Sequence, residues 1–225
     1  MGVTDVLKID IWSDIACPWC YIGKRRFEEG QRRYAATDGA LPVEVEYHSF
    51  ELAPDTPADF EGSEVDFRAR HKRLPAQDVE QMLAHVTKIA ADVGLAYDFD
   101  ALRHANTRKA HQVLHLAKAQ GRQLALAERL FAAYFEEGRH IGHDDDLAAL
   151  AADAGLDPAE VLDALRDRTF ADDVDADIDQ ARAYGISGVP FFVVDGRYGI
   201  SGAQDPALFA QALTQASEDR TKVEA

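Results

Sequence analysis

The chain has 225 residues, 47% of them hydrophobic, and is therefore long enough to bury a sizeable core. Its formal net charge of −16 makes nucleic acid and anionic membranes poor partners, because both require a cationic surface. Residues 1–14 lack a basic stretch followed by an apolar one, and no apolar run is long enough to span a bilayer. We therefore expect a soluble, cytoplasmic protein.

The first elements predicted along the chain form a β-α-β unit. Leu7–Trp12 alternates apolar and polar residues, which is typical of a half-buried strand. Trp19–Tyr34 contains no proline and carries spaced apolar residues, which predicts a helix. Pro42–Phe50 again alternates, with Val43 and Val45 set against glutamates, and predicts a second strand.

From Ser63 to Tyr184 the pattern is helical. Glycines at plausible helix ends divide this stretch into five or six helices: Gly94, Gly121, Gly138, Gly155 and Gly185. Helix starts are expected at Ser63 with Asp66 in a capping box, at Asn106 with Thr107, at Asp144, and at Asp157 before Pro158. His111 then falls on the buried face of the helix that Asn106 caps.

The chain returns to β character near its C-terminal end. Val189–Val194 and Tyr198–Ile200 are predicted strands, joined by a hairpin turn at Asp195-Gly196. Pro206–Gln215 is predicted to form the last helix, and the tail from Ser217 is expected to fray.

This order of elements predicts an α/β protein, a thioredoxin-like fold with a large inserted all-helical domain. We expect residues 1–61 and 172–225 to form the thioredoxin-like domain, and residues 62–171 to form the inserted helical domain. Fold alone assigns no function, so the chemistry has to be read from particular residues.

The two cysteines of the chain, Cys17 and Cys20, are too close together to form a framework of structural disulfides. In a reducing compartment, such a C-x-x-C pair indicates redox chemistry or metal binding. Backbone N–H groups at a helix N-terminus stabilise a thiolate, so we expect Cys17 to attack and Cys20 to resolve the mixed disulfide. Pro18 suits the first helical turn, and Trp19 offers an apolar contact to substrate.

Zinc binding is an alternative for this pair, with His140 and His143 completing the site. The setting argues against it, because Cys-Pro-Trp-Cys opens a helix after a strand, whereas zinc-binding turns favour residues such as glycine. We therefore expect no metal, and we place His140 and His143 at the surface before a helix start.

The charged residues near the cysteines could have either a catalytic or a structural role. Asp14 is a candidate proton acceptor during exchange, but a loop aspartate more often ends a strand or forms a turn, and we favour that structural role. Lys24, Arg25 and Arg26 lie one to two turns beyond Cys20, and we expect them to point to solvent, where their charge is screened.

Several stretches resemble the DsbA-like thioredoxin-fold family, and within it the FrnE-type branch associated with polyketide biosynthesis. They are Ser13–Lys24 (SDIACPWCYIGK), Asn106–His111 (NTRKAH), Ala133–Glu137 (AYFEE), and Ser187–Phe192 followed by Ser201–Gln204. The resemblance implies a thiol-disulfide oxidoreductase with a cis peptide bond at Val189–Pro190. It also implies that this loop packs against the redox pair and contacts substrate.

The chain differs from these relatives in two respects, and a related group of enzymes offers an alternative function. Exported DsbA proteins carry histidine where Trp19 stands, and some FrnE-type relatives have a second cysteine pair, which this chain lacks. The related 2-hydroxychromene-2-carboxylate isomerases and kappa-class glutathione transferases shape a glutathione site with their insertion. A glutathione-dependent isomerase or transferase is therefore the alternative, although those relatives usually have serine where Cys17 stands.

The expected partner is a protein or small molecule that contains a disulfide or a thiol. We expect no bound cofactor, and glutathione is the candidate redox partner. The sequence leaves open whether the chain forms a homodimer.

Overall fold

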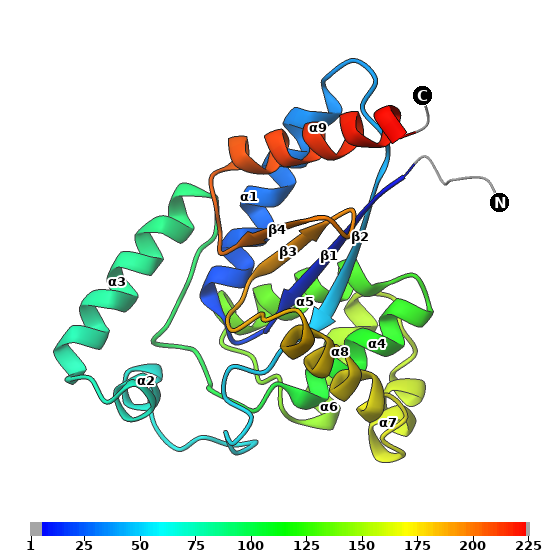
Figure 1. The fold of residues 1–225 in the computed structure, drawn as a ribbon. Helices are drawn as coiled ribbons and strands as arrows, with labels where there is room; N and C mark the ends of the chain where they lie inside the picture. The colour runs from blue at the N-terminus through cyan, green and yellow to red at the C-terminus, as the bar shows by residue number, and fades with distance from the viewer. Residues whose placement is uncertain (1–5, 224–225) are drawn as a thin grey trace.

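The computed structural model describes residues 6–223 and contains a four-stranded sheet with helices around it (Figure 1). The strands are β1 (Leu7–Ser13), β2 (Val43–Ser49), β3 (Phe191–Val194) and β4 (Tyr198–Ser201). The helices are α1 (Pro18–Ala35), α2 (Glu64–Lys72), α3 (Ala76–Asp92), α4 (Arg108–Ala119), α5 (Gln123–Phe135), α6 (Asp144–Asp153), α7 (Pro158–Arg166), α8 (Ala171–Ala183) and α9 (Pro206–Val223). The predicted fold class, a thioredoxin-like fold with a helical insertion, is confirmed.

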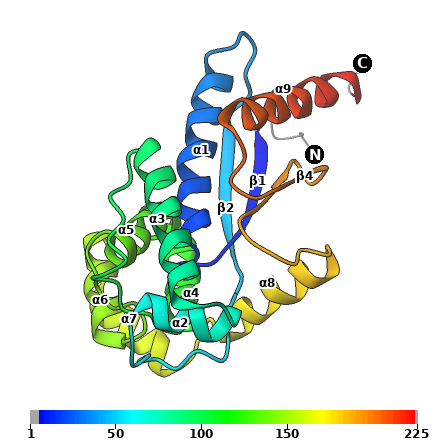
Figure 2. The same ribbon diagram turned by 90° about the vertical axis from the view of Figure 1, so that its left-hand side faces the viewer.

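The sheet has the strand order β2-β1-β3-β4, with β1 and β2 parallel and the other pairs antiparallel. Helix α1 connects the two parallel strands, as a parallel pair requires a crossover. Helix α9 packs beside α1, and the helices α4–α8 gather at the end of the sheet where β1 and β2 finish, whereas α2 and α3 stand to one side (Figure 1 and Figure 2). The carboxyl ends of two parallel strands therefore face the helical insertion.

Seven helices, α2–α8, lie between β2 and β3 in the described part of the chain, against the five or six predicted. The prediction counted glycines as helix ends, and all five of them do adopt positive φ. Two further helix ends carry arginine in that conformation, Arg73 with φ 55° and Arg168 with φ 54°. Because non-glycine residues rarely adopt positive φ, the sequence did not mark these two ends. The predicted domain limits at 61/62 and 171/172 stay a prediction.

The structure confirms some of the predicted helix caps and contradicts others. Ser63 and Asp66 form the capping box, and Asp157 caps α7 through its side chain. The prediction for Asp144 is wrong, because His143 is the cap residue and Asp144 is the first helical residue. At α4 the cap position belongs to Thr107, while the Asn106 side chain accepts a hydrogen bond from the Arg108 N–H at 2.9 Å.

The predicted frayed tail is wrong within the described residues, because α9 continues past Gln215 to Val223. A contact with the β3–β4 turn stabilises the extension: Arg220 Nε donates to the Asp195 carboxylate at 2.9 Å. That turn takes positive φ at Asp195 and Gly196, as the hairpin prediction requires. Strand β3 starts at Phe191, two residues later than predicted, because Val189 and Pro190 belong to the preceding loop.

One continuous core joins the sheet to the insertion. Its fully buried side chains include Ile9 and Ile11 of β1, Tyr21 of α1, and Phe131 and Phe135 of α5. The Tyr21 ring stacks on Phe131 with centroids 5.0 Å apart. Among the described residues, no helix combines the length and apolar character needed to cross a membrane. The shared core fixes α1, and with it the cysteines, against the insertion.

Candidate active site

The two cysteines lie where α1 begins. Cys17 is the cap residue, with φ −91° and ψ 112°, Pro18 is the first helical residue, and Cys20 lies one turn into the helix. The Cys20 N–H donates to the Cys17 carbonyl at 3.0 Å, and the Cys17 N–H donates to the Asp14 carbonyl at 3.0 Å. Both cysteines are free thiols, 4% and 2% exposed.

The two sulfurs differ in how readily they ionise. The Cys20 thiol donates to the Cys17 sulfur and lowers the pKa of Cys17, and the backbone N–H groups of Cys20 and Trp19 act in the same direction. Burial and the Asp14 charge oppose this effect. Burial, followed by the hydrogen bond to Cys17, raises the pKa of Cys20 well above its ordinary value. The arrangement therefore favours a thiolate on Cys17 and a retained proton on Cys20.

The loop before β3 closes on Cys17 from the other side. The Val189–Pro190 peptide bond is cis, as the family resemblance implied, and the Cys17 thiol donates to the Val189 carbonyl at 3.6 Å. Pro190 approaches α1 closely: a Cβ atom added at Gly23 would lie 2.9 Å from the proline ring. Glycine at this position thus lets the loop pack directly on the helix that carries the cysteines.

Asp14 is 1% exposed and forms the turn before Cys17. Its carboxylate accepts hydrogen bonds from the Leu52 N–H at 2.8 Å and the Ala16 N–H at 3.3 Å, which is the structural role expected from the sequence. His111 of α4 brings Nε2 to 3.5 Å from the same carboxylate. Burial opposes ionisation, but the nearby His111 ring and the Leu52 N–H together outweigh it and lower the pKa of Asp14. This histidine, 1% exposed, lies on the buried face of its helix as predicted.

A cavity of about 480 Å³ opens beside Cys17, and we call it the outer cavity. It is lined by Asp14, Ala16, Cys17, Pro18, Trp19, Leu52, Ala53, Thr56, Phe67, Arg68, His71, Lys72, Met82, Leu83, Val86, His104, Ala105, Thr107 and Val189. Of the predicted site residues, Cys17, Pro18, Trp19 and Val189 meet here, whereas Cys20 and Pro190 lie behind this surface. The sequence did not indicate the far wall, which α2 and α3 provide.

The prediction that Lys24, Arg25 and Arg26 point to solvent is wrong. Lys24 is buried, and its Nζ and the Arg25 guanidinium both bind the carboxylate of Glu128 on α5. Arg26 donates to the Ala203 carbonyl at 2.5 Å. The first half of α1 is covered by α5 and by the loop after β4, so these three side chains meet protein groups. Although burial opposes it, hydrogen bonds from Arg25, Lys24 and Tyr21 lower the pKa of Glu128 to about 2.

The prediction that His140 and His143 both lie at the surface is half wrong, because His140 is buried and stacks on His143 with ring centroids 3.8 Å apart. Both rings face the carboxylate of Asp59, His143 Nε2 at 2.7 Å and His140 Nε2 at 3.4 Å. Among residues 6–223, the groups of three or more potential metal ligands do not include a cysteine. The structure thus groups His140 and His143 with Asp59 and not with Cys17 and Cys20, as the zinc alternative would require.

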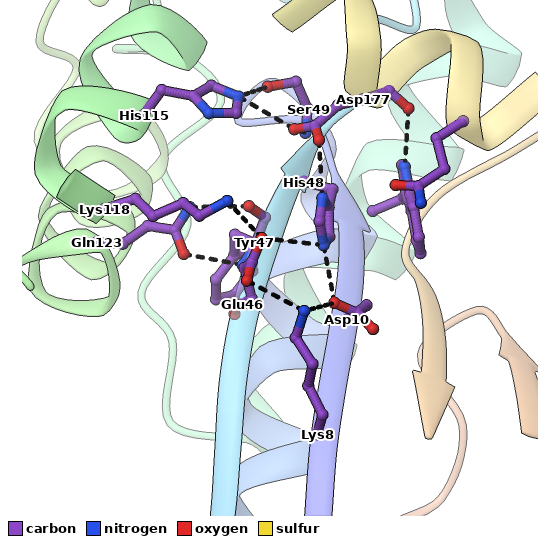
Figure 3. A network of polar contacts seen from close by, with 12 residues as sticks. Lys8, Asp10, Glu46, Tyr47, His48, Ser49, His115, Lys118, Gln123 and Asp177 are labelled. Carbon is purple, nitrogen blue, oxygen red and sulfur yellow. Dashed lines mark hydrogen bonds and ion pairs between the residues drawn. The ribbon is translucent and has the colours of Figure 1, made fainter. Parts of the chain in front are cut away.

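The sequence did not indicate a polar network, buried at its centre and exposed at its two lysines, where α4 and α8 meet β1 and β2 (Figure 3). Its members are Lys8, Asp10, Glu46, His48, Ser49, His115, Lys118 and Asp177. The His48 ring lies between two carboxylates, with Nδ1 2.8 Å from Asp177 and Nε2 2.9 Å from Asp10. Burial lowers the pKa of His48, but these hydrogen bonds outweigh it and raise the pKa to about 9.

Comparisons with known proteins identify a family and several proteins that this chain resembles in sequence and fold. A family model described as "DSBA-like thioredoxin domain" matches residues 8–214. The uncharacterized protein YwbO of Bacillus subtilis is 30% identical over 213 residues, which cover 92% of this chain and 96% of YwbO. The structure of a probable DsbA oxidoreductase from Streptomyces coelicolor is 41% identical, with a TM-score of 0.86 over 95% of this chain and 91% of that one. A 2-hydroxychromene-2-carboxylate isomerase shares the fold at 16% identity, with a TM-score of 0.70 over 97% and 100% of the two chains.

Proposed function

Because the chain belongs to the DSBA-like thioredoxin domain family, we propose that it exchanges thiols and disulfides through Cys17 and Cys20. The observation that carries this proposal is the placement of the pair at the start of α1, where Cys17 is the cap residue and borders the outer cavity; in this position the pKa of Cys17 is lowered and that of Cys20 is raised. A thiolate is the nucleophile in disulfide exchange, so the residue with the lowered pKa attacks first.

The exchange then follows two steps. The Cys17 thiolate attacks one sulfur of a substrate disulfide, whose S–S bond breaks, and the other substrate sulfur leaves as a thiolate. Cys20 then loses its proton and attacks the Cys17 sulfur. The internal disulfide forms, the second substrate thiolate leaves, and the substrate has gained the two electrons that the protein has lost. Run backwards, the same steps oxidise a substrate dithiol.

Substrate would lie in the outer cavity. Trp19 is 36% exposed there and presents an apolar face, while Pro18 and Val189 border the Cys17 sulfur. Pro190 holds the loop against α1 and would position Val189 for backbone pairing with a peptide-like substrate. We assign the chain to the FrnE-type branch on the motif Ser13–Lys24, and a cytoplasmic location is part of this proposal.

The deciding experiment equilibrates the protein in graded glutathione buffers and counts alkylatable thiols by mass. We expect one transition in which two thiols disappear together, and its midpoint gives the reduction potential. The Cys20→Ser variant is the matched control and should instead gain one glutathione on Cys17. Thiols that never interconvert in the unmodified protein would contradict the proposal.

A glutathione-dependent isomerase or transferase is the second candidate, and the outer cavity favours it. Its volume of about 480 Å³ suits a small molecule, and Arg68, His71 and Lys72 of α2 supply cationic or protonatable groups for carboxylates. In this reaction Cys17 would activate bound glutathione without forming a disulfide with Cys20. Conjugation of glutathione to 1-chloro-2,4-dinitrobenzene that survives Cys20→Ser would support this candidate, whereas loss of the reaction in that variant would exclude it.

A further inference from the structure

The resolving cysteine has no open route to solvent for its proton. Cys20 is 2% exposed and does not line the outer cavity, and a substrate bound to Cys17 would cover that side. Burial keeps the pKa of Cys20 well above its ordinary value. If Cys20 attacks Cys17 as the proposed function requires, its proton has to leave through the interior.

The acidic and phenolic groups around Cys20 are poorly placed to take that proton. The Asp14 carboxylate faces the outer cavity and is engaged by the Leu52 and Ala16 N–H groups. Burial raises the pKa of Tyr47 on β2 and of Tyr97 after α3, so neither phenol is a base at neutral pH. Cys17 is consumed in the mixed disulfide at this stage.

A second cavity is lined by Ser13, the residue whose hydroxyl neighbours Cys20, and we call it the inner cavity. It measures about 10 Å³, room for about one water molecule, and all of its lining residues are buried. Its polar wall includes Ser13, Ser49, His111 and His115. The Ser13 hydroxyl lies next to the Cys20 sulfur, where it lowers the pKa of that thiol.

Two of these polar groups have unused hydrogen-bonding capacity. Within residues 6–223, Ser13 Oγ and His111 Nε2 are buried without a hydrogen bond of regular geometry, although His111 Nε2 lies 3.5 Å from Asp14. A buried polar atom that lacks a partner costs free energy, which an ordered water recovers when the site is polar and large enough. The inner cavity meets both conditions.

A continuous series of polar contacts leads from the inner cavity to Asp10 on β1 (Figure 3). His115 Nε2 lies 3.1 Å from Ser49 Oγ and 3.0 Å from the Asp177 carboxylate. The other oxygen of Asp177 binds His48 Nδ1 at 2.8 Å, and His48 Nε2 binds Asp10 at 2.9 Å. The side chain of Asp10 is 17% exposed, so the series ends at a carboxylate that water reaches.

We propose that the inner cavity binds one water molecule that carries the Cys20 proton from Ser13 to His115, and that Asp177, His48 and Asp10 lead it to solvent. The Cys20 thiol gives its proton to the Ser13 hydroxyl, which passes its own proton to the water. The sulfur lone pair then forms the bond to Cys17, and the bond between Cys17 and substrate breaks. His48 first releases a proton from Nε2 toward Asp10 and then takes one at Nδ1 from Asp177, because both ring nitrogens are bonded to carboxylates.

The reaction of the reduced protein with one equivalent of the aromatic disulfide 5,5′-dithiobis(2-nitrobenzoate) separates the two steps. The first release of the coloured thiolate reports attack by Cys17, and the second reports attack by Cys20. We expect Ser13→Ala and His115→Leu to retain the first phase and to slow the second by about tenfold or more at pH 7.

Gln112→Leu is the matched control. It removes another buried polar side chain from α4 whose Oε1 has no hydrogen-bond partner in the described residues, and Gln112 does not line the inner cavity. This variant should keep both phases. Equal slowing by Gln112→Leu, or an unchanged second phase in Ser13→Ala and His115→Leu, would overturn the relay. A missing first phase in the unmodified protein would instead overturn the proposed function.

A measurement on the unmodified protein tests the relay independently of how the variants fold. Transfer of the Cys20 proton through a hydroxyl and a water predicts a larger solvent deuterium isotope effect on the second phase than on the first. Equal isotope effects on the two phases would contradict the relay.

Discussion

The two cysteines lie one helical turn apart, yet they face different surroundings. Cys17 borders the outer cavity of about 480 Å³, next to a partly exposed tryptophan, whereas Cys20 lies next to Ser13, which lines the inner cavity of about 10 Å³. The difference indicates that position at the start of α1, rather than residue type, separates the two cysteines. Under the proposed function, Cys17 would meet the substrate, and Cys20 would react only after Cys17 has bound it.

Replacing each cysteine in turn should have the largest effect on activity and tests the difference between the two sulfurs. Cys17→Ser should abolish insulin reduction, because the accessible nucleophile is lost. Cys20→Ser should trap mixed disulfides on Cys17, since the resolving sulfur is gone. Mass spectrometry of the intact protein distinguishes the two outcomes. Insulin reduction that persists in Cys17→Ser would contradict the roles assigned to the two sides.

His48→Gln tests the inner side through its effect on stability. The pKa of His48 is raised from 6.5 to about 9 in the folded protein, so protonation stabilises the fold. This contribution is complete below about pH 6.5 and is lost as pH rises through about 9; it amounts to about 3 kcal/mol. Urea unfolding at pH 6 and pH 10 should therefore show the two proteins converging at high pH. The exposed His85→Gln change is the control and should leave the pH dependence as it is.

Glu128→Gln weakens the contact that holds α1, and thus both cysteines, against α5. Glu128 binds Lys24, Arg25 and Tyr21, and its partial exposure limits the expected loss to about 1 kcal/mol in the free energy of unfolding. Because the pKa of Glu128 is lowered from 4.5 to about 2, this difference is complete above about pH 4.5 and disappears as pH falls to about 2. Glu29→Gln, which breaks only exposed pairs with Arg32 and Arg33, should change stability little. Loss of activity without loss of stability in Glu128→Gln would mean that Glu128 acts on the sulfurs directly.

Lys72→Glu should have the smallest effect on reaction rate, and it tests whether substrates reach Cys17 through the outer cavity. Lys72 lines the outer cavity, so reversing its charge should slow the reaction of Cys17 with a dianionic aromatic disulfide about threefold at low salt. The uncharged 4,4′-dithiodipyridine should react at an unchanged rate. Lys88→Glu makes the same change of charge on an exposed part of α3 outside the cavity. If both variants slow the charged reagent equally, net charge rather than the cavity is responsible.

The sequence predicted the parts of the fold that depend on neighbours along the chain. Strand alternation, the helix start at Pro18, the capping box of Ser63 and the Asp195-Gly196 turn are all local signals, and the structure contains each of them. The helix ends at Arg73 and Arg168 were missed because arginine rarely adopts positive φ and gives no local sign of it.

The surroundings of the cysteines were harder to predict, because they depend on residues far apart in sequence. His48 meets Asp177 across 129 positions, and Lys24 meets Glu128 across 104. Lys24 follows the redox motif on a helix, and without knowledge of a partner helix its charge predicts a solvent-exposed position. The outer wall was missed for the same reason, since nothing local shows that α2 and α3 fold over Cys17.

The wall formed by α2 and α3 stands apart from the sheet in Figure 1 and contains neither cysteine nor strand. Changes in its sequence or length therefore alter what reaches the reactive sulfur, while the start of α1 and the inner cavity keep their geometry. Evolution can in this way vary the choice of substrate and conserve the chemistry within the same chain. For protein engineering, α2 and α3 are a segment to exchange, and Ser13–Lys24 is a segment to leave intact.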